Sequence, residues 1–527
     1  SATPSIGSGV ATVTERASLP GIKVAMKPSG LSLLPMAPTR DLGGGGMIAG
    51  DVTHETGDVG QALDQLAREI LRHLSEHKLT VLWLFDESGS MRDDQQAIKA
   101  KFDRVATELK ANTDADPKSA GALTHAIIGF GELIHYELEK PTTDIELIRR
   151  AIDRLRIDET GKEHTMHALV DVINHYARLI NKERRLLIVL ATDESGDDGE
   201  YVEEARQAAV NRGVPIYVIG RQALFGASAA HLLYVDPVTK DHYWPPIRRG
   251  PETAGEEALQ WDGLYGRRDE QPSGFAPYEL ARLVKDTGGI YFLLPSEEGM
   301  RVRQREKAYS IATLKEYVPD YESRATYLGR LRRSPFRTAL IEIIEATRGF
   351  PFREHFPVAL DQLAEAIIPA GQQAETRLQS LMQIEQKLRS LEKLRDREPE
   401  KRWQAAYDLM LAQIVTYQVK AYEYRACLLE MVARAQRGQL RPSKPPSPQL
   451  VIEWSIGHSR DHKAPKQETE KKYAEAERLL KRVIERHPQT PWADLAQDEI
   501  DRGFGCQWGE WQHNPRYDER AKLVPNY

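Results

Sequence analysis

"WLFDESGSMRDD", residues 83–94, places a carboxylate and two hydroxyls directly behind an apolar run. The run, residues 80–85, is short and consists largely of strand-forming residues, so it predicts a buried strand. Asp86, Ser88 and Ser90 follow at the carboxyl end of this strand. In open α/β sheets, ligands bind in the crevice outside the carboxyl ends of the parallel strands. The stretch therefore predicts a polar site at one edge of a sheet.

Short apolar runs and amphipathic helices alternate from residue 80 to about residue 295. Strands are expected at 81–85, 125–130, 186–191, 215–219 and 290–294. Helices are expected near 94–110, 144–155, 166–181, 200–212 and 277–286. A further strand at 133–138 follows its predecessor so closely that an antiparallel edge hairpin is expected. The pattern predicts an α/β fold with a doubly wound, mostly parallel sheet that helices cover on both faces.

The rest of the chain divides by composition and periodicity. Two apolar helical stripes on either side of Pro399 predict a long helical hairpin of coiled-coil type. The expected order is a flexible Gly/Pro-rich arm (1–55), the α/β domain (56–299), a helical region (300–436), a Pro-rich linker (437–466), and a helix-turn-helix with a tail (467–527). The last part weakly resembles a single tetratricopeptide unit, which cannot bury its apolar face alone and must dock elsewhere.

Residues 221–275 interrupt the alternation and form an insertion inside the α/β domain. A hairpin is expected there, from 231–235 to 242–244, followed by a Pro/Gly-rich stretch. The aromatic residues Trp244, Trp261 and Tyr265 have two interpretations. They form either an interaction surface or a small satellite core that anchors a long loop.

Composition narrows the classes of function. The formal net charge of −6 over 527 residues does not indicate a nucleic-acid surface. No apolar stretch reaches the length of a membrane span, and the two cysteines lack metal-binding spacing. Because the usual hydrolase and nucleotide-binding motifs are absent, we expect a protein that is not an enzyme. The start, Ser-Ala-Thr-Pro-Ser, fits a mature end after removal of a signal peptide, so a periplasmic or secreted location is expected, although a trimmed chain would look the same.

Three polar motifs follow strands or open a helix in the α/β domain: D-x-S-x-S at 86–90, T-x-x-A-L at 165–169, and T-D at 192–193. Together they resemble the metal-ion-dependent adhesion site of von Willebrand factor A domains, and the resemblance covers about residues 75–296. The ligand positions of that family fall on Asp86, Ser88, Ser90, Thr165 and Asp193. The resemblance implies a Mg²⁺ site, or one for Mn²⁺ or Ca²⁺.

The implied function is adhesion or scaffolding through a protein partner. Neutral hydroxyl ligands leave much of the charge of the cation uncompensated, and the resemblance implies that an Asp or Glu of the partner completes the coordination. Glu194 stands where the family usually has glycine, and Asp197 follows closely. These acids could favour Ca²⁺ or Mn²⁺, or could occupy the open position and make the site closed and structural. A further alternative is a non-catalytic subunit that works with an ATPase or maturation enzyme system.

Overall fold

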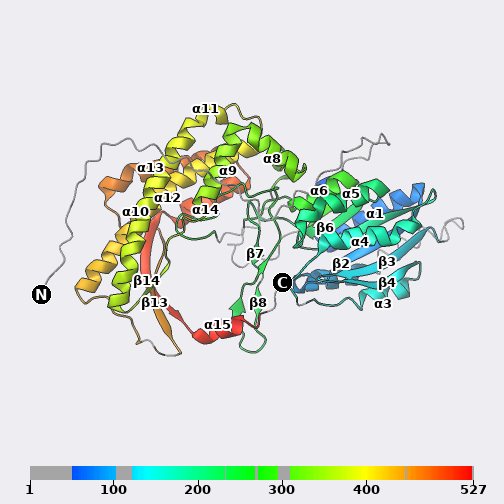
Figure 1. Ribbon diagram of the computed structural model, residues 1–527, viewed down its shortest axis with the longest axis horizontal. Helices are drawn as coiled ribbons and strands as arrows, with labels where there is room; N and C mark the ends of the chain where they lie inside the picture. Colours follow the sequence, from blue (N-terminus) through cyan, green and yellow to red (C-terminus); the bar gives the residue numbers. More distant parts are fainter. Residues whose placement is uncertain are drawn as a thin grey trace. The chain divides into compact units, whose positions relative to one another are not determined.

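A seven-stranded sheet forms the centre of the first half of the chain (Figure 1). The computed structural model describes residues 50–102, 121–158, 160–231, 233–267, 271–294, 309–445, 447 and 449–524. All of them belong to one compact unit, residues 46–527.

The strand order is β1-β11-β6-β5-β2-β3-β4, and every neighbouring pair is parallel except β3 and β4. The strands are β1 (Asp51–Glu55), β2 (Lys78–Asp86), β3 (Leu123–Phe130), β4 (Ile134–Thr142), β5 (Arg184–Ala191), β6 (Ile216–Arg221) and β11 (Ile290–Leu294). The mostly parallel sheet and the antiparallel edge strand confirm the fold class that the sequence predicts.

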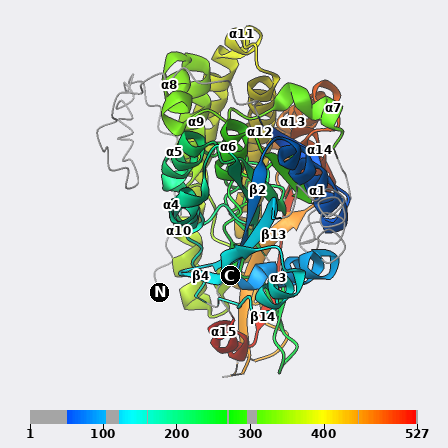
Figure 2. The ribbon, with the colours of Figure 1, turned by 90° about the vertical axis from the view of Figure 1, so that its right-hand side faces the viewer.

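Helices cover both faces of this sheet, as the side view shows (Figure 2). One face carries α4 (Thr165–Tyr176), α5 (Val202–Arg212) and α6 (Tyr278–Thr287). The other carries α1 (Val59–Glu76), the helical residues 92–102 and α3 (Ile145–Ile152). Along β2, Leu82 and Leu84 enter the first core and Trp83 and Phe85 enter the second. The strand therefore has to be apolar throughout, because side chains alternate between two buried faces.

The prediction of a flexible arm over residues 1–55 is wrong at its end. Residues 51–55 form β1 and pair in parallel with β11. The rest of that arm, residues 1–49, lies outside the described residues.

The insertion carries four strands of two residues each, which form two two-stranded sheets, and the expected hairpin is present as β8 paired with β9. They are β7 (Ala230–His231), β8 (Tyr234–Val235), β9 (His242–Tyr243) and β10 (Pro246–Ile247). For two of the three aromatic residues Trp244, Trp261 and Tyr265, both interpretations need correction. Trp261 and Tyr265 are buried, and they belong to the core of the helical region instead of to an exposed surface or a separate satellite cluster.

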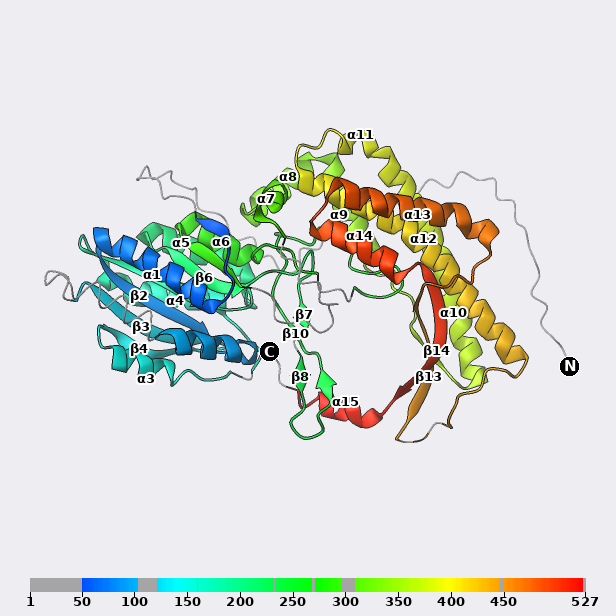
Figure 3. The same cartoon turned by 180° about the vertical axis from the view of Figure 1, so that it is seen from behind.

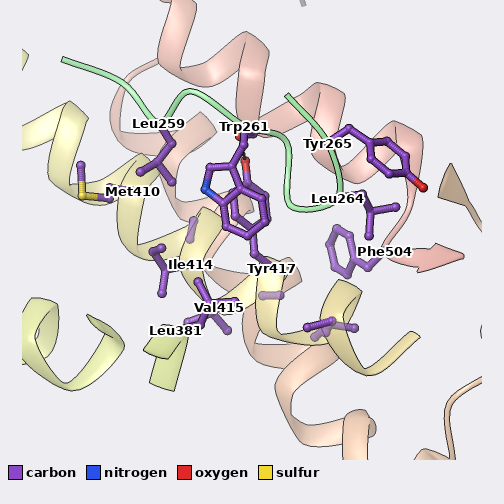
Figure 4. Packing of buried hydrophobic residues seen from close by; sticks show 14 of the residues in the cluster. Leu259, Trp261, Leu264, Tyr265, Leu381, Met410, Ile414, Val415, Tyr417 and Phe504 are labelled. Carbon is purple, nitrogen blue, oxygen red and sulfur yellow. Dashed lines mark hydrogen bonds between the residues drawn. The ribbon is translucent and has the colours of Figure 1, made fainter. Parts of the chain in front are cut away.

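Two long helices dominate the second half, on either side of Pro399 as the sequence predicts. The helices are α7 (Ile311–Leu314), α8 (Arg324–Arg333), α9 (Pro335–Thr347), α10 (Leu360–Ser390), α11 (Glu392–Arg395) and α12 (Lys401–Gln436). Helix α12 is buried on all sides along most of its length. Figure 4 shows why: Leu259 and Trp261 of the insertion pack onto Met410, Ile414 and Tyr417 of this helix.

Helices α13 (Lys466–Arg486) and α14 (Pro491–Arg502) lie against α12 (Figure 3). The predicted helix-turn-helix thus buries its apolar face on the long helix. The short α15 (Pro515–Ala521) follows near the end of the chain. Single 3₁₀ turns are η1 (Gly89–Met91), η3 (Ala177–Leu179), η4 (Gly199–Tyr201) and η5 (Lys315–Tyr317). Among the described residues, no helix is long and apolar enough to cross a membrane.

The segment 437–466, expected to be a linker, contains a strand. β13 (Val451–Ser459) lies between β12 (His355–Pro357) and β14 (Gly505–His513) in an antiparallel three-stranded sheet. The sequence does not predict this strand, because the Pro-rich composition of 441–448 indicates a linker. The partner strands also lie about 50 or more residues away along the chain.

Candidate metal centre

The predicted ligand residues lie at one edge of the sheet. Asp86 is the last residue of β2, and Asp193 follows the neighbouring strand β5 by two residues. Phe85 pairs with Ala191 across these strands, which brings the two loops side by side. Thr165 is the first residue of α4.

Hydrogen bonds connect the first loop to the third. The Ser90 hydroxyl donates to Asp193 Oδ1 at 3.0 Å, and it lies 2.9 Å from the Ser88 hydroxyl. The Ser88 backbone N–H donates to Asp86 Oδ1 at 2.8 Å. The Thr192 hydroxyl donates to Asp86 Oδ2 at 2.7 Å. Four of the five predicted residues therefore form one continuous polar chain, and both oxygens of Asp86 are held in place.

The second loop packs on the third through Gly196. This residue has φ +79°, and a Cβ atom placed on it would lie 2.5 Å from Thr165 Oγ1. Asp197 N–H donates to the backbone carbonyl of Glu163 at 2.8 Å. The Thr165 hydroxyl is fully buried and has no hydrogen-bond partner among the described residues. An unsatisfied buried hydroxyl is rare and needs an explanation, such as an ion in contact with it.

The site also gathers buried carboxyl groups. Asp86, Glu163, Asp193 and Glu194 are each less than 5% exposed. Burial, and then the Asp193 carboxylate, raises the pKa of Asp86 to about 7. Burial, and then Asp86, raises the pKa of Glu163 to about 8, and burial and Asp193 raise the pKa of Glu194 well above its usual range. The negative charges of these carboxyl groups repel one another, and a divalent cation bound among them would offset that repulsion.

The two additional acids differ in their surroundings. Glu194 Oε2 accepts a hydrogen bond from the Arg248 backbone N–H at 3.0 Å, whereas its Oε1 is buried and has no hydrogen-bond partner among the described residues. Asp197 pairs with the Arg248 side chain at 3.1 Å, and that side chain is 72% exposed. The Asp198 carboxylate accepts hydrogen bonds from the backbone N–H groups of Met166 and His167 at the start of α4.

Sequence reasoning missed three residues of this site: Glu163, Thr192 and Arg249. Glu163 stands two residues before Thr165, and nothing in its local sequence indicates that it is buried beside Asp86. Thr192 was visible in the T-D motif, and its role as a holder of Asp86 follows from the pairing of β2 with β5. Arg249 gave no signal, because it comes from the insertion 56 residues beyond Asp193. It is fully buried, and its guanidinium lies 3.4 Å from Asp193 Oδ2.

Within the described ranges, no group of three or more His, Cys, Asp or Glu side chains is arranged to hold a metal ion. A cation at this edge of the sheet would therefore depend on the hydroxyls of Ser88, Ser90 and Thr165 together with the carboxylates. Hydroxyl and carboxylate oxygens are the ligands that Mg²⁺ and Ca²⁺ prefer. The residues present fit such an ion.

Comparison with known proteins gives a family for the domain that carries this site. Residues 80–231 match the family model of the von Willebrand factor type A domain. Among solved structures, the chain is similar to the conserved hypothetical protein BatB from Bacteroides thetaiotaomicron, with 17% identity over 42% of this chain and 93% of that chain and a TM-score of 0.27. It is also similar to the SpRpn10 VWA domain, with 11% identity over 41% of this chain and 87% of that chain and a TM-score of 0.25. No curated protein matches.

Proposed function

We propose that this protein is a divalent-cation-dependent protein-binding module, because residues 80–231 match the family model of the von Willebrand factor type A domain. The cation, Mg²⁺ or else Mn²⁺ or Ca²⁺, is held by Ser88, Ser90 and Thr165, with Asp86 and Asp193 directly or through water. The observation that carries the proposal is the buried Thr165 hydroxyl, which packs on the loop of Asp193 and finds no hydrogen-bond partner in the described part of the chain.

The ligand set explains what such a site binds. Three of the five groups are neutral hydroxyls, so the bound cation keeps an excess of positive charge for an anionic oxygen from outside. The hydrogen bonds of Asp86 to Thr192 and Ser88 hold its carboxylate in place. We therefore propose that the partner offers an Asp or Glu side chain, and that the protein acts as an adhesion or scaffold component without catalysing a reaction.

A closed, structural site is the second candidate, and Glu194 favours it. Its Oε1 is buried beside the other carboxyls and has no hydrogen-bond partner among the described residues. If Glu194 contacts the ion, no position is open to a partner. Glu194→Gly separates the two candidates: in the closed site it creates a position for added carboxylate ligands, whereas in the open site it leaves partner binding unchanged.

The direct test is calorimetric titration of the full chain with Mg²⁺ and Mn²⁺. Thr165→Val keeps the shape of the side chain and removes the hydroxyl, so we expect it to weaken cation binding at least tenfold. Thr416→Val is the matched control, because Thr416 is equally buried but its hydroxyl donates to the carbonyl of Ala412 in α12. Equal cation affinity in Thr165→Val and the unaltered chain would overturn the proposal.

A second experiment measures the binding of a protein partner to the chain and its variants, immobilised on a solid support. Capture of a protein partner should be lost in chelator and in Asp86→Ala with the fold intact, and should return with added Mg²⁺. Capture that persists unchanged in both conditions would mean that the partner binds elsewhere on the protein.

A further inference from the structure

Two consecutive residues of the insertion are connected to the Asp193 loop through both side chains and backbone. Arg249 Nε donates to the Asp193 carbonyl at 3.1 Å, and Nη2 lies 3.4 Å from its carboxylate. In return, the Ser195 hydroxyl donates to the Arg249 carbonyl at 3.2 Å. The Arg248 N–H donates to Glu194 at 3.0 Å. The insertion is thus attached at the point where the third loop contributes to the site.

The backbone on either side keeps Arg249 in this position. Ile247 pairs with Ala230 within the insertion. Gly250 has φ +78°, and a Cβ atom on it would lie 2.7 Å from the Ser195 hydroxyl, so the chain approaches the third loop as closely as sterics allow. Arg249 itself is 0% exposed. A guanidinium so enclosed stays charged at every ordinary pH and cannot swing into solvent.

The position of this charge has a consequence for the cation. A positive group in contact with one carboxylate of the site offsets part of the negative charge that would otherwise attract the ion. Arg249 lies 3.4 Å from the Asp193 carboxylate, and the neighbouring Arg248 backbone N–H donates to Glu194, so the guanidinium charge acts inside the cluster of buried carboxyl groups. The net attraction for a divalent cation is therefore smaller than the carboxylates alone would give, and the bound ion keeps more of its charge for an external anion.

We propose that Arg249 is a specificity-determining residue of the metal site: it is a fixed internal counter-ion that weakens retention of the cation and favours addition of an anionic ligand. The proposal rests on the proposed function, because it requires that the site binds a cation. The sign of the change in Mg²⁺ affinity on removal of Arg249 distinguishes this role from a purely structural one. A residue that only positions Asp193 would weaken cation binding when removed, whereas a counter-ion would strengthen it.

The test is calorimetric titration of the full chain with Mg²⁺ alone, at constant ionic strength. Arg249→Met preserves most of the side-chain volume and removes the charge, and we expect it to bind Mg²⁺ about tenfold more tightly, the order expected for a unit charge near a dication. Arg249→Lys restores the charge and should return the affinity to within about threefold of the unaltered chain. Arg248→Met is the matched control, because the Arg248 side chain is exposed and pairs with Asp197 while its backbone N–H contact with Glu194 is retained.

Weaker or unchanged Mg²⁺ binding in a folded Arg249→Met protein would overturn the proposal and leave the proposed function standing. Absence of Mg²⁺ and Mn²⁺ binding in the unaltered chain would overturn both. If Arg249→Met does not fold, the sign is read from Arg249→Gln, which also removes the charge but keeps a polar side chain. Tighter Mg²⁺ binding in that variant supports the proposal, and weaker or unchanged binding overturns it.

Discussion

The Thr165 side chain shows how a candidate metal ligand can oppose stability. Its hydroxyl is buried with no hydrogen-bond partner among the described residues. Leaving such a group unsatisfied costs about 1–3 kcal/mol, which a bound ion would recover. The penalty falls on the metal-free protein alone.

We therefore expect Thr165→Val to raise the free energy of unfolding in chelator by about 1 kcal/mol or more. Added Mg²⁺ should stabilise the unaltered chain more than the variant, because the variant binds the ion more weakly. Denaturant unfolding with and without Mg²⁺ measures both effects. A variant that is less stable than the unaltered chain in chelator would contradict the assignment of an unsatisfied hydroxyl.

Substitution of Gly196 and of Gly213 separates the effect of a steric clash with Thr165 from the cost of a left-handed backbone conformation. Both have positive φ, +79° and +61°. A Cβ atom on Gly196 would meet Thr165 Oγ1 at 2.5 Å, whereas one on Gly213 would meet nothing within 4 Å. We expect each substitution by Ala to cost about 1–2 kcal/mol of stability for the left-handed backbone. Only Gly196→Ala should also weaken Mg²⁺ binding, as measured by calorimetry, and equal Mg²⁺ affinities in the two variants would refute the steric argument.

The sequence predicts most accurately those residues of the candidate site whose spacing follows from the fold. Asp86, Ser88, Ser90 and Asp193 were predicted together, and hydrogen bonds connect them in the structure. Their role as metal ligands stays a prediction. The strand before the insertion runs toward this edge, so the sequence indicates that the insertion overhangs the site, but nothing near Arg249 indicates which of its residues reaches the third loop.

At the scale of elements, α12 depends on the insertion. Trp261 is 1% exposed, and its ring lies 4.8 Å from that of Tyr417 in an edge-to-face arrangement (Figure 4). The Tyr417 hydroxyl donates to the Trp261 carbonyl at 3.1 Å. The long helix is therefore covered by a segment that precedes it by about 150 residues.

We expect Trp261→Ala to lower the free energy of unfolding by about 3–5 kcal/mol, because it leaves a large cavity against α12. Trp511→Ala is the control, since Trp511 is 36% exposed on β14 and should cost far less. Denaturant unfolding gives the two values, and hydrogen exchange should show the loss of protection in α12. A small cost for Trp261→Ala would mean that the insertion is dispensable to the helical region.

The helices of the second half were easier to predict than its strands. Apolar stripes at spacings of three and four are visible within a single helix. Strand β13 alternates in burial, with Ile452, Trp454 and Ile456 facing the core, and this alternation was a usable signal. Its partners β12 and β14 lie far away in the sequence, so pairing could not be read locally.

On the scale of the whole molecule, a buried ion cluster joins the insertion to α12. Arg402 is 3% exposed and contacts Glu252 at 2.5 Å and Glu257 at 2.7 Å. The second Glu252 oxygen accepts from the Gly226 N–H, and Glu257 accepts from the Tyr327 hydroxyl. The cluster is therefore satisfied on all sides only while the insertion and the helices stay together.

Removal of one member of such a cluster leaves a buried charge uncompensated, which typically costs 3–5 kcal/mol. We expect a loss of about this size for Arg402→Met. Arg348→Met is the control, because Arg348 pairs with Glu256 and Glu345 at the surface, where ion pairs contribute about 0–1 kcal/mol. Thermal unfolding of the two variants makes the comparison. Similar midpoints would show that the cluster does not hold the parts together.

The burial of Trp261 and Tyr265 among the helices has a consequence for how this protein can be divided. A fragment that ended at β11 would retain every residue of the candidate metal centre but would expose the aromatic side chains that α12 now covers. Such a fragment would associate with itself instead of behaving as an independent module. The boundary that the sequence indicates near residue 300 is thus a boundary of composition only, and the α/β domain and the helices that follow it would have to be expressed and transplanted as one piece.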